Sequence, residues 1–154
     1  MVTGARAAET LAAPPAPLPP LPRRRSIDEV LADARSRLDR LTPVQAVAAR
    51  DRGAVVVDIR PAAQREVQGG PGDVLIVERN VLEWRFDPQS DARLPIADYD
   101  LQVIVLCQEG FTSSLAAAAL QDLGLHRATD VVGGYQAWRE QLCGWKAWRE
   151  QVGA

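Results

Sequence analysis

One cysteine stands where the chain could perform nucleophilic chemistry. Cys107 follows four apolar, mostly β-branched residues, a short loop containing Gly110 comes next, and Ser113 or Ser114 opens an alanine-rich helix. A buried parallel strand that ends at a turn just before a helix start places the sulfur near unpaired backbone N–H groups and the positive end of the helix dipole. Both features favour the thiolate, and the same N–H groups attract anions. We therefore predict that Cys107 is a nucleophile beside an anion-accepting loop.

The other residues able to carry chemistry lack such a setting. Cys143 lies in a short repeat, at a position where the second copy has Gly153, and we expect an incidental thiol. His126 follows Gly124 in a connection and is expected at the surface, not as a general base. A cysteine after an apolar strand is itself more often a small buried hydrophobe than a nucleophile, so its wider context decides between the two interpretations.

Three short motifs supply that context. The loop after the strand reads C-Q-E-G-F-T, the segment 55–61 reads V-V-V-D-I-R-P, and the segment 131–138 reads V-V-G-G-Y-Q-A-W. They resemble, in order, the active-site loop C-x-x-G-x-T/R, the early D-x-R motif and the closing G-G-x-x-A-W of the rhodanese (sulfurtransferase) family. Three motifs in the family's order are far more specific than any one alone.

The resemblance implies sulfur transfer. In that family the cysteine, here Cys107, accepts a sulfane sulfur as a persulfide and passes it to a thiol or another nucleophile. The substrate-binding loop would consist of Gln108, Glu109, Gly110, Phe111, Thr112 and Ser113. Their backbone amides would hold the transferred sulfur or the donor oxyanion, and the hydroxyls of Thr112 and Ser113 would add donors. Thiosulfate or a persulfide-carrying protein would be the sulfur donor, and no cofactor is implied.

The loop departs from the family where charge matters. Active sulfurtransferases often place Arg or Lys in the two positions after the cysteine, whereas this chain has Gln108 and Glu109. A carboxylate about 7 Å from a bound anion costs roughly 0.6 kcal/mol at a water-like dielectric and about 2.4 kcal/mol at an effective dielectric of 20. A helix terminus returns only about 0.3 to 1 kcal/mol, or up to about 2 kcal/mol if it is partly buried. We therefore expect weak thiosulfate binding and favour a less charged donor such as a protein persulfide.

Two rival functions remain open. The first is a phosphatase or arsenate reductase of the same fold, which Thr112 disfavours because related phosphatases place an anion-clamping arginine at that position. The second is a non-catalytic rhodanese-like binding module, which the retention of Cys107 disfavours. Asp58 and Arg60 follow a strand at its carboxyl end, where ligand sites gather. We assign them a structural role near the site, since charges at strand ends commonly pair.

The elements that must position these residues alternate between strand and helix. A capping box of Ser26 and Glu29 begins an amphipathic helix to about Arg40, and Thr42 with Gln45 begins a second helix to about Arg50. Strands are predicted at 54–58, 74–77, 103–106 and 129–132, with helical segments after 79, after 112 and around 138. This alternation predicts an α/β fold with a parallel sheet of about four to five strands and helices on both faces, whose strand order cannot be read.

Length and composition favour one domain with appendages. The 154 residues, 47% of them hydrophobic, suffice for one sizeable core. We predict a disordered Pro/Ala-rich tail at 1–25, an N-terminal helix at 26–41, a rhodanese-like domain at 42–141 and a duplicated helical tail at 142–154. In that tail we expect Trp145 and Trp148 to cover an apolar patch in preference to a partner surface.

Charge and cysteine content exclude several classes of protein. A net charge of −2 argues against a general binder of nucleic acid or acidic membranes. Two cysteines far apart and one histidine offer neither a zinc site nor a disulfide framework, which favours a reducing cytoplasm. No stretch is apolar and long enough to span a bilayer, and prolines interrupt any signal core. The oligomeric state cannot be read from the sequence.

Overall fold

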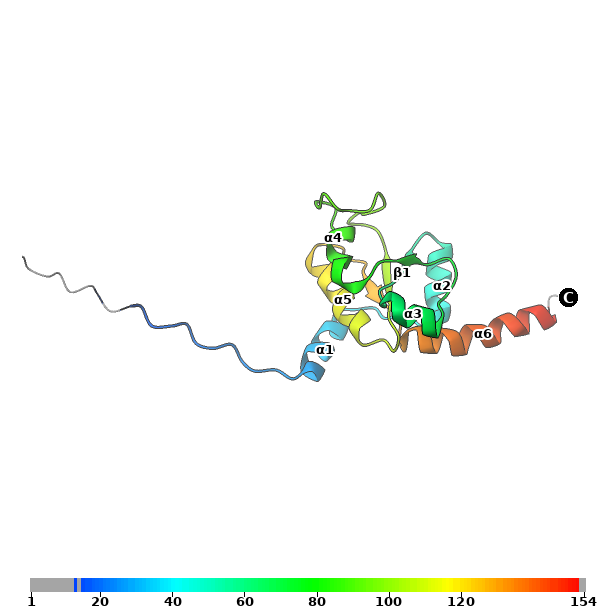
Figure 1. The fold of residues 1–154 in the computed structure, drawn as a ribbon, viewed down its shortest axis with the longest axis horizontal. Helices are drawn as coiled ribbons and strands as arrows, with labels where there is room; N and C mark the ends of the chain where they lie inside the picture. Colours follow the sequence, from blue (N-terminus) through cyan, green and yellow to red (C-terminus); the bar gives the residue numbers. More distant parts are fainter. Residues whose placement is uncertain (1–12, 14, 153–154) are drawn as a thin grey trace, which may run out of the picture.

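The computed structural model describes residue 13 and residues 15–152, and it describes side-chain surroundings as far as Cys143. Within this range an exposed segment without helix or strand leads into a domain of alternating helices and strands, and the last helix, α6, extends away from its body (Figure 1). Residues 1–12 and 14 of the predicted tail at 1–25 lie outside the described residues, and its remaining residues form the exposed segment. Trp145 and Trp148 lie in the part of α6 whose side chains are not described.

A four-stranded parallel sheet forms the centre of the domain, as predicted. Its strands are β1 (Val55–Asp58), β2 (Leu75–Ile76), β3 (Val103–Leu106) and β4 (Thr129–Asp130). Their order across the sheet is β2-β1-β3-β4, and every neighbouring pair is parallel. β3 therefore lies between β1 and β4, and Cys107, which follows β3, lies between the carboxyl ends of both neighbours.

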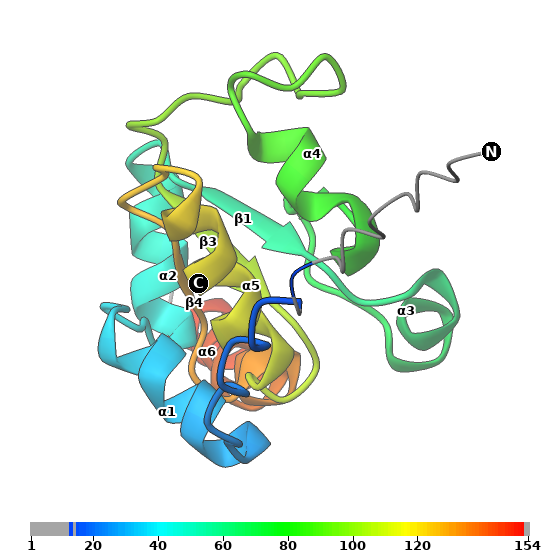
Figure 2. The ribbon, with the colours of Figure 1, turned by 90° about the vertical axis from the view of Figure 1, so that its left-hand side faces the viewer.

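Helices cover both faces of the sheet. One core holds α4 (Leu82–Phe86), α5 (Thr112–Asp122) and the alternate β3 residues Val103 and Val105, whereas Ile104 and Leu106 point into the other core, with α2 (Pro43–Asp51) and α6 (Gly134–Val152). α1 (Ile27–Ser36) packs against α5 (Figure 2). The continuous apolar run of β3 thus reflects burial on both sides, as expected for an inner parallel strand.

Both predicted capping boxes are confirmed. Ser26 and Glu29 exchange backbone-to-side-chain hydrogen bonds of 2.8 and 3.1 Å, and Thr42 and Gln45 do so at 2.9 and 3.2 Å. α1 nevertheless ends at Ser36, so the predicted helix to about Arg40 is wrong beyond that point.

The chain leaves the helix because the sheet edge competes for its backbone groups. Leu41 N–H donates to the Asp130 carbonyl at 3.0 Å, and the Leu41 carbonyl accepts from Val132 N–H at 2.8 Å. Leu38 is buried in the core beside α5. The stretch after α1 therefore covers the outer edge of β4, which would otherwise be exposed.

Four further elements refine or correct the sequence prediction. α3 (Ala62–Gln68) was missed because it buries no residue and so shows no apolar period. A short 3₁₀ turn, η1 (Arg79–Val81), precedes α4, close to the predicted helical segment. α5 begins at Thr112, ahead of the two serines expected to open it, and α6 runs through both copies of the terminal repeat as one helix. In the part of the chain that the structure describes, no helix is long and apolar enough to cross a membrane.

Candidate active site at the carboxyl end of the central strand

The Cys107 sulfur lies at the N-terminal end of α5. Its side chain is buried, with 7% exposed, and Sγ accepts hydrogen bonds from Gly110 N–H and Ser113 N–H, both at 3.3 Å. One donor comes from the loop and the other from the first turn of the helix. Backbone N–H groups converging on sulfur from two directions suit a negatively charged acceptor better than a neutral thiol.

The loop requires a glycine at its midpoint. Gly110 has φ +82°, and a Cβ atom there would lie 2.8 Å from Gly133 N and 3.1 Å from the Val131 carbonyl oxygen. A side chain would thus meet both an unfavourable backbone conformation and fixed backbone atoms. The turn that directs Gly110 N–H at the sulfur depends on this residue.

The start of α6 holds the outer side of the same loop. Tyr135 N–H donates to the Cys107 carbonyl at 2.8 Å, and Gln136 N–H donates to the Gln108 carbonyl at 3.0 Å. Gly134, with φ +60°, allows this approach because a Cβ there would collide with the Cys107 carbonyl. The first turn of α6 therefore binds the carbonyls of the loop. The N–H groups of Gly110 and Ser113 face the sulfur at the start of α5.

A cavity of about 570 Å³ opens in front of the sulfur. Of the residues predicted for the site, Arg60, Cys107, Gln108, Glu109, Phe111 and Thr112 line it. The rest of its wall consists of residues that the sequence did not single out for the site: Ile59, Pro61, Gln64, Glu78, Arg79 and Asn80. Arg79 is engaged by Glu83 at 2.7 Å, whereas Glu109 is exposed and has no ion pair among the described residues. An unbalanced carboxylate therefore stands at the cavity rim.

Asp58 and Arg60 form a buried ion pair beside the cavity. Each side chain is only 1% exposed, and Arg60 donates to the two Asp58 carboxylate oxygens at 3.0 and 2.7 Å. Arg60 also donates to the Gln108 side-chain oxygen at 2.8 Å and stacks over the Tyr135 ring. The pair thus fixes one loop side chain and also contributes to the cavity wall.

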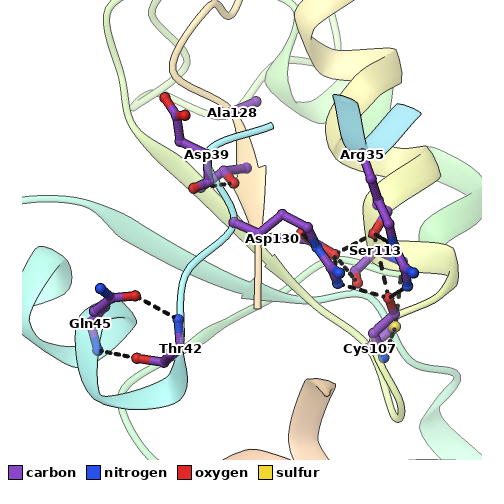
Figure 3. A network of polar contacts seen from close by, with 12 residues as sticks. Arg35, Asp39, Thr42, Gln45, Cys107, Ser113, Ala128 and Asp130 are labelled. Carbon is purple, nitrogen blue, oxygen red and sulfur yellow. Dashed lines mark hydrogen bonds and ion pairs between the residues drawn. The ribbon is translucent and has the colours of Figure 1, made fainter. Parts of the chain in front are cut away.

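A second buried carboxylate lies behind the loop and was missed. Asp130 is fully buried and accepts hydrogen bonds from Arg40 Nε at 2.7 Å, Ser113 Oγ at 2.8 Å and Ser114 Oγ at 2.7 Å (Figure 3). The Ser113 hydroxyl therefore donates to Asp130, which corrects its predicted role as a donor to substrate. The contribution of Ser113 to the sulfur is its backbone N–H.

Two arginines that precede the domain predicted at 42–141 also reach the loop. Arg35 Nη2 and Arg40 Nη2 donate to the Gly110 carbonyl at 2.7 and 3.1 Å, and Arg35 Nε donates to Ser114 Oγ at 3.1 Å. No local motif separates them from Arg37, which forms an exposed pair with Asp122. Only the docking of α1 against α5 reveals which arginines face the loop.

The remaining candidates carry no such arrangement. Cys143 is an exposed free thiol on α6, and His126 is exposed and 3.8 Å from Asp100. Among the described residues, no group of three His, Cys, Asp or Glu side chains is placed to hold a metal ion.

Comparisons with known proteins place this geometry in context. A family model described as "Rhodanese-like domain" matches residues 42–141. The thiosulfate sulfurtransferase GlpE of Pseudomonas savastanoi pv. phaseolicola is 32% identical over 100 residues, covering 65% of this chain and 86% of that protein. The adenylyltransferase and sulfurtransferase UBA4 of Eremothecium gossypii is 31% identical over 96 residues, covering 60% of this chain and 21% of that protein.

Solved structures agree with the fold. A Rhodopseudomonas palustris protein, RPA3614, described as of unknown function and a possible tyrosine phosphatase, superposes with a TM-score of 0.70 at 34% identity, covering 79% of this chain and 95% of that one. The human single-domain sulfurtransferase TSTD1 has a TM-score of 0.55 at 18% identity, covering 66% of this chain and 95% of that one, and supports the fold alone.

Proposed function

Because the chain belongs to the rhodanese-like domain family, we propose that it is a sulfurtransferase with Cys107 as the persulfide-forming nucleophile. The observation that carries the proposal is the Cys107 sulfur, which accepts two backbone N–H groups at the base of an open cavity. Those donors would stabilise negative charge on the cysteine sulfur, and neighbouring loop amides would stabilise it on the transferred sulfur.

The reaction balances without a redox partner. The Cys107 thiolate attacks the sulfane sulfur of the donor, a new S–S bond forms, and the donor leaves with the electron pair of the broken bond, as sulfite when the donor is thiosulfate. A nucleophile such as a thiolate then attacks the outer sulfur, and Cys107 leaves as the thiolate. Two free cysteines fit a reducing compartment, and we place the reaction in the cytoplasm.

Glu109 bears on the choice of donor. Its exposed carboxylate lines the cavity and lacks an ion pair among the described residues, so it opposes a doubly charged anion more than a monoanion. The relatives named thiosulfate sulfurtransferase make thiosulfate the first donor to test. We favour a persulfide-carrying protein or small persulfide as the better donor, and a thiol as the acceptor.

Phosphate-ester hydrolysis is the less favoured alternative, although the R. palustris relative is described as a possible tyrosine phosphatase. The loop has Thr112 where an anion-clamping arginine would be required. Arg60 and Arg79, which line the cavity, are each engaged by a carboxylate. The non-catalytic binding module remains the other alternative, and it gives no role to the N–H groups that converge on Cys107.

Intact-mass measurement tests the proposal. Incubation with thiosulfate or glutathione persulfide should add one sulfur atom to the protein, and dithiothreitol should remove it. Cys107→Ser should abolish the addition, whereas the matched control Cys143→Ser should keep it. Sulfur found only on Cys143, or on neither cysteine with any donor, would refute the assignment and leave the binding module as the better hypothesis.

A further inference from the structure

The Gly110 carbonyl oxygen lies on the side of the loop that faces away from the cavity, and it is contacted there by positively charged side chains. Two guanidinium groups donate to this one oxygen, from Arg35 at 2.7 Å and from Arg40 at 3.1 Å. The Arg35 guanidinium also lies 5.4 Å from the centre of the Phe111 ring, at the cavity rim. The Gly110 carbonyl oxygen has two lone pairs, so it can accept from both guanidinium groups at once, and both charges then act on the peptide group to which it belongs.

That peptide group carries the effect to the front of the loop. The bond between Gly110 and Phe111 is trans, so Phe111 N–H points opposite to the Gly110 carbonyl and away from both arginines. Among the described residues, Phe111 N–H has no protein acceptor. Charged donors on the oxygen polarise the peptide and strengthen its N–H as a donor. The arginines therefore both orient and strengthen an amide that is open to a ligand.

The two arginines differ in net charge. Arg40 is paired with the buried carboxylate of Asp130, so its charge is largely balanced. Arg35 is half-buried, and its hydrogen-bond partners, the Ser114 hydroxyl and the Gly110 carbonyl, are both neutral. It has no carboxylate partner among the described residues. Arg35 is thus the source of uncompensated positive charge at a loop whose own side chains supply a carboxylate instead.

We propose that Arg35 is a positioning residue that makes the Cys107 site selective for anions by acting through the Gly110–Phe111 peptide. Arg40, which is paired with Asp130, donates to the same Gly110 carbonyl and helps to fix this peptide group in place. The site would thereby accept an anionic donor or a persulfide anion despite Glu109. The identity of that anion rests on the proposed function, but the selectivity for negative charge at Cys107 does not.

Alkylation of Cys107 measures this selectivity without sulfur transfer. Iodoacetate and iodoacetamide react with the thiolate by the same displacement of iodide, but only iodoacetate is an anion. The ratio of their rate constants on the Cys143→Ser protein reports how well the site receives negative charge. Arg35→Gln and Arg35→Met should lower that ratio about fivefold, the effect of one charge removed at an intermediate dielectric. Arg35→Lys, which keeps the charge, should retain most of it.

The control separates a local effect from net charge and from loosening of the fold. Arg37→Gln removes the same charge from the same end of α1, but Arg37 bonds to Asp122 at the surface and does not touch the loop, so its ratio should stay at the wild-type value. A merely structural role of Arg35 would change both rate constants together and leave the ratio constant. That outcome, or an equal fall in Arg37→Gln, would overturn the proposal. If the ratio falls as expected in Arg35→Gln but no donor forms a persulfide on Cys107, this inference stands and the proposed sulfurtransferase activity is refuted.

Discussion

Asp58 and Asp130 end the two strands that flank β3, and each holds an arginine that braces one side of the Cys107 loop. The first pair joins residues two positions apart, and its arginine reaches the Gln108 side chain. The second joins residues ninety positions apart, and its arginine reaches the Gly110 carbonyl. The Asp58–Arg60 pair needs only the end of β1 and the residues directly after it. The Arg40–Asp130 pair exists only when the segment after α1 lies against β4. One side of the loop is thus held by a local ion pair, and the other side by an ion pair that depends on the packing of the N-terminal segment.

The largest difference between the braces should appear in stability. Asp58→Asn leaves Arg60 buried without its carboxylate and should lower the free energy of unfolding by about 3 to 5 kcal/mol. Asp130→Asn should cost less, about 1 to 3 kcal/mol, because the Arg40 side chain is 18% exposed and can turn toward water. Urea unfolding measures both, with the surface variant Asp122→Asn as a control expected within about 0.5 kcal/mol of wild type. Equal losses for Asp58→Asn and Asp130→Asn would contradict this ranking.

A substitution at Gly110 tests whether the loop, whose Gly110 carbonyl accepts from Arg40, can adopt another backbone conformation. Gly110→Ala should lower stability by about 1 to 3 kcal/mol and sharply reduce the modification of Cys107, since its Cβ meets fixed backbone atoms. Gly53→Ala is a matched control, because Gly53 also has positive φ but a Cβ there meets nothing within 4 Å. We expect the control to lose about 1 to 2 kcal/mol from its backbone conformation alone and to keep the rate of Cys107 alkylation. Similar alkylation rates in both variants would show that the loop adapts.

Glu109 tests the charge on the cavity side against the charge behind the loop. Glu109→Lys should raise kcat/KM for thiosulfate about fivefold, and more at low ionic strength, since it exchanges repulsion for attraction. Glu109→Gln should give an intermediate value. Steady-state kinetics at two salt concentrations would check this, and an unchanged or lower kcat/KM would mean that the side chain points away from the bound donor.

The smallest effect should come from pH at the start of α1. Hydrogen bonds from the Ser26 backbone and from Arg23 hold the pKa of Glu29 below its usual value of 4.5. The folded-state pKa is therefore the lower one, so the stabilisation is present above pH 4.5 and is lost as the pH falls through the lowered pKa. Glu29→Ala should thus reduce the melting temperature slightly at pH 7, with the difference narrowing in acid. A difference that grows in acid would contradict the capping role.

The sequence predicts what short-range chemistry specifies. Cys107 at the end of an apolar strand, the two capping boxes and the glycines of the loop all depend on neighbours within a few residues, and the structure has them where expected. The parallel sheet followed from the alternation of elements. The exposed α3 escaped notice because its sequence carries no apolar period.

Contacts between distant segments could not be predicted in this way. Arg35, Arg40 and Asp130 meet only because α1 packs on α5 and Leu41 pairs beside β4. The hydroxyl of Ser113 was assigned to substrate because nothing local reveals a buried carboxylate seventeen positions away. The predicted domain start at 42 coincides with the family match, yet two residues before it contact the loop. We therefore propose that the functional unit begins near residue 26.

The terminal repeat lies where α6 can be lengthened without disturbing the rest of the domain. Gly134, Tyr135 and Gln136, which hold the loop, all belong to the first copy, and the second copy starts at Gly144 on the same helix. Ten extra residues lengthen a helix by about 15 Å along its axis without moving its first turn. A duplication there therefore leaves the distances around the Cys107 sulfur as they were. This end of the chain can acquire new sequence while the Cys107 site stays under its original constraints.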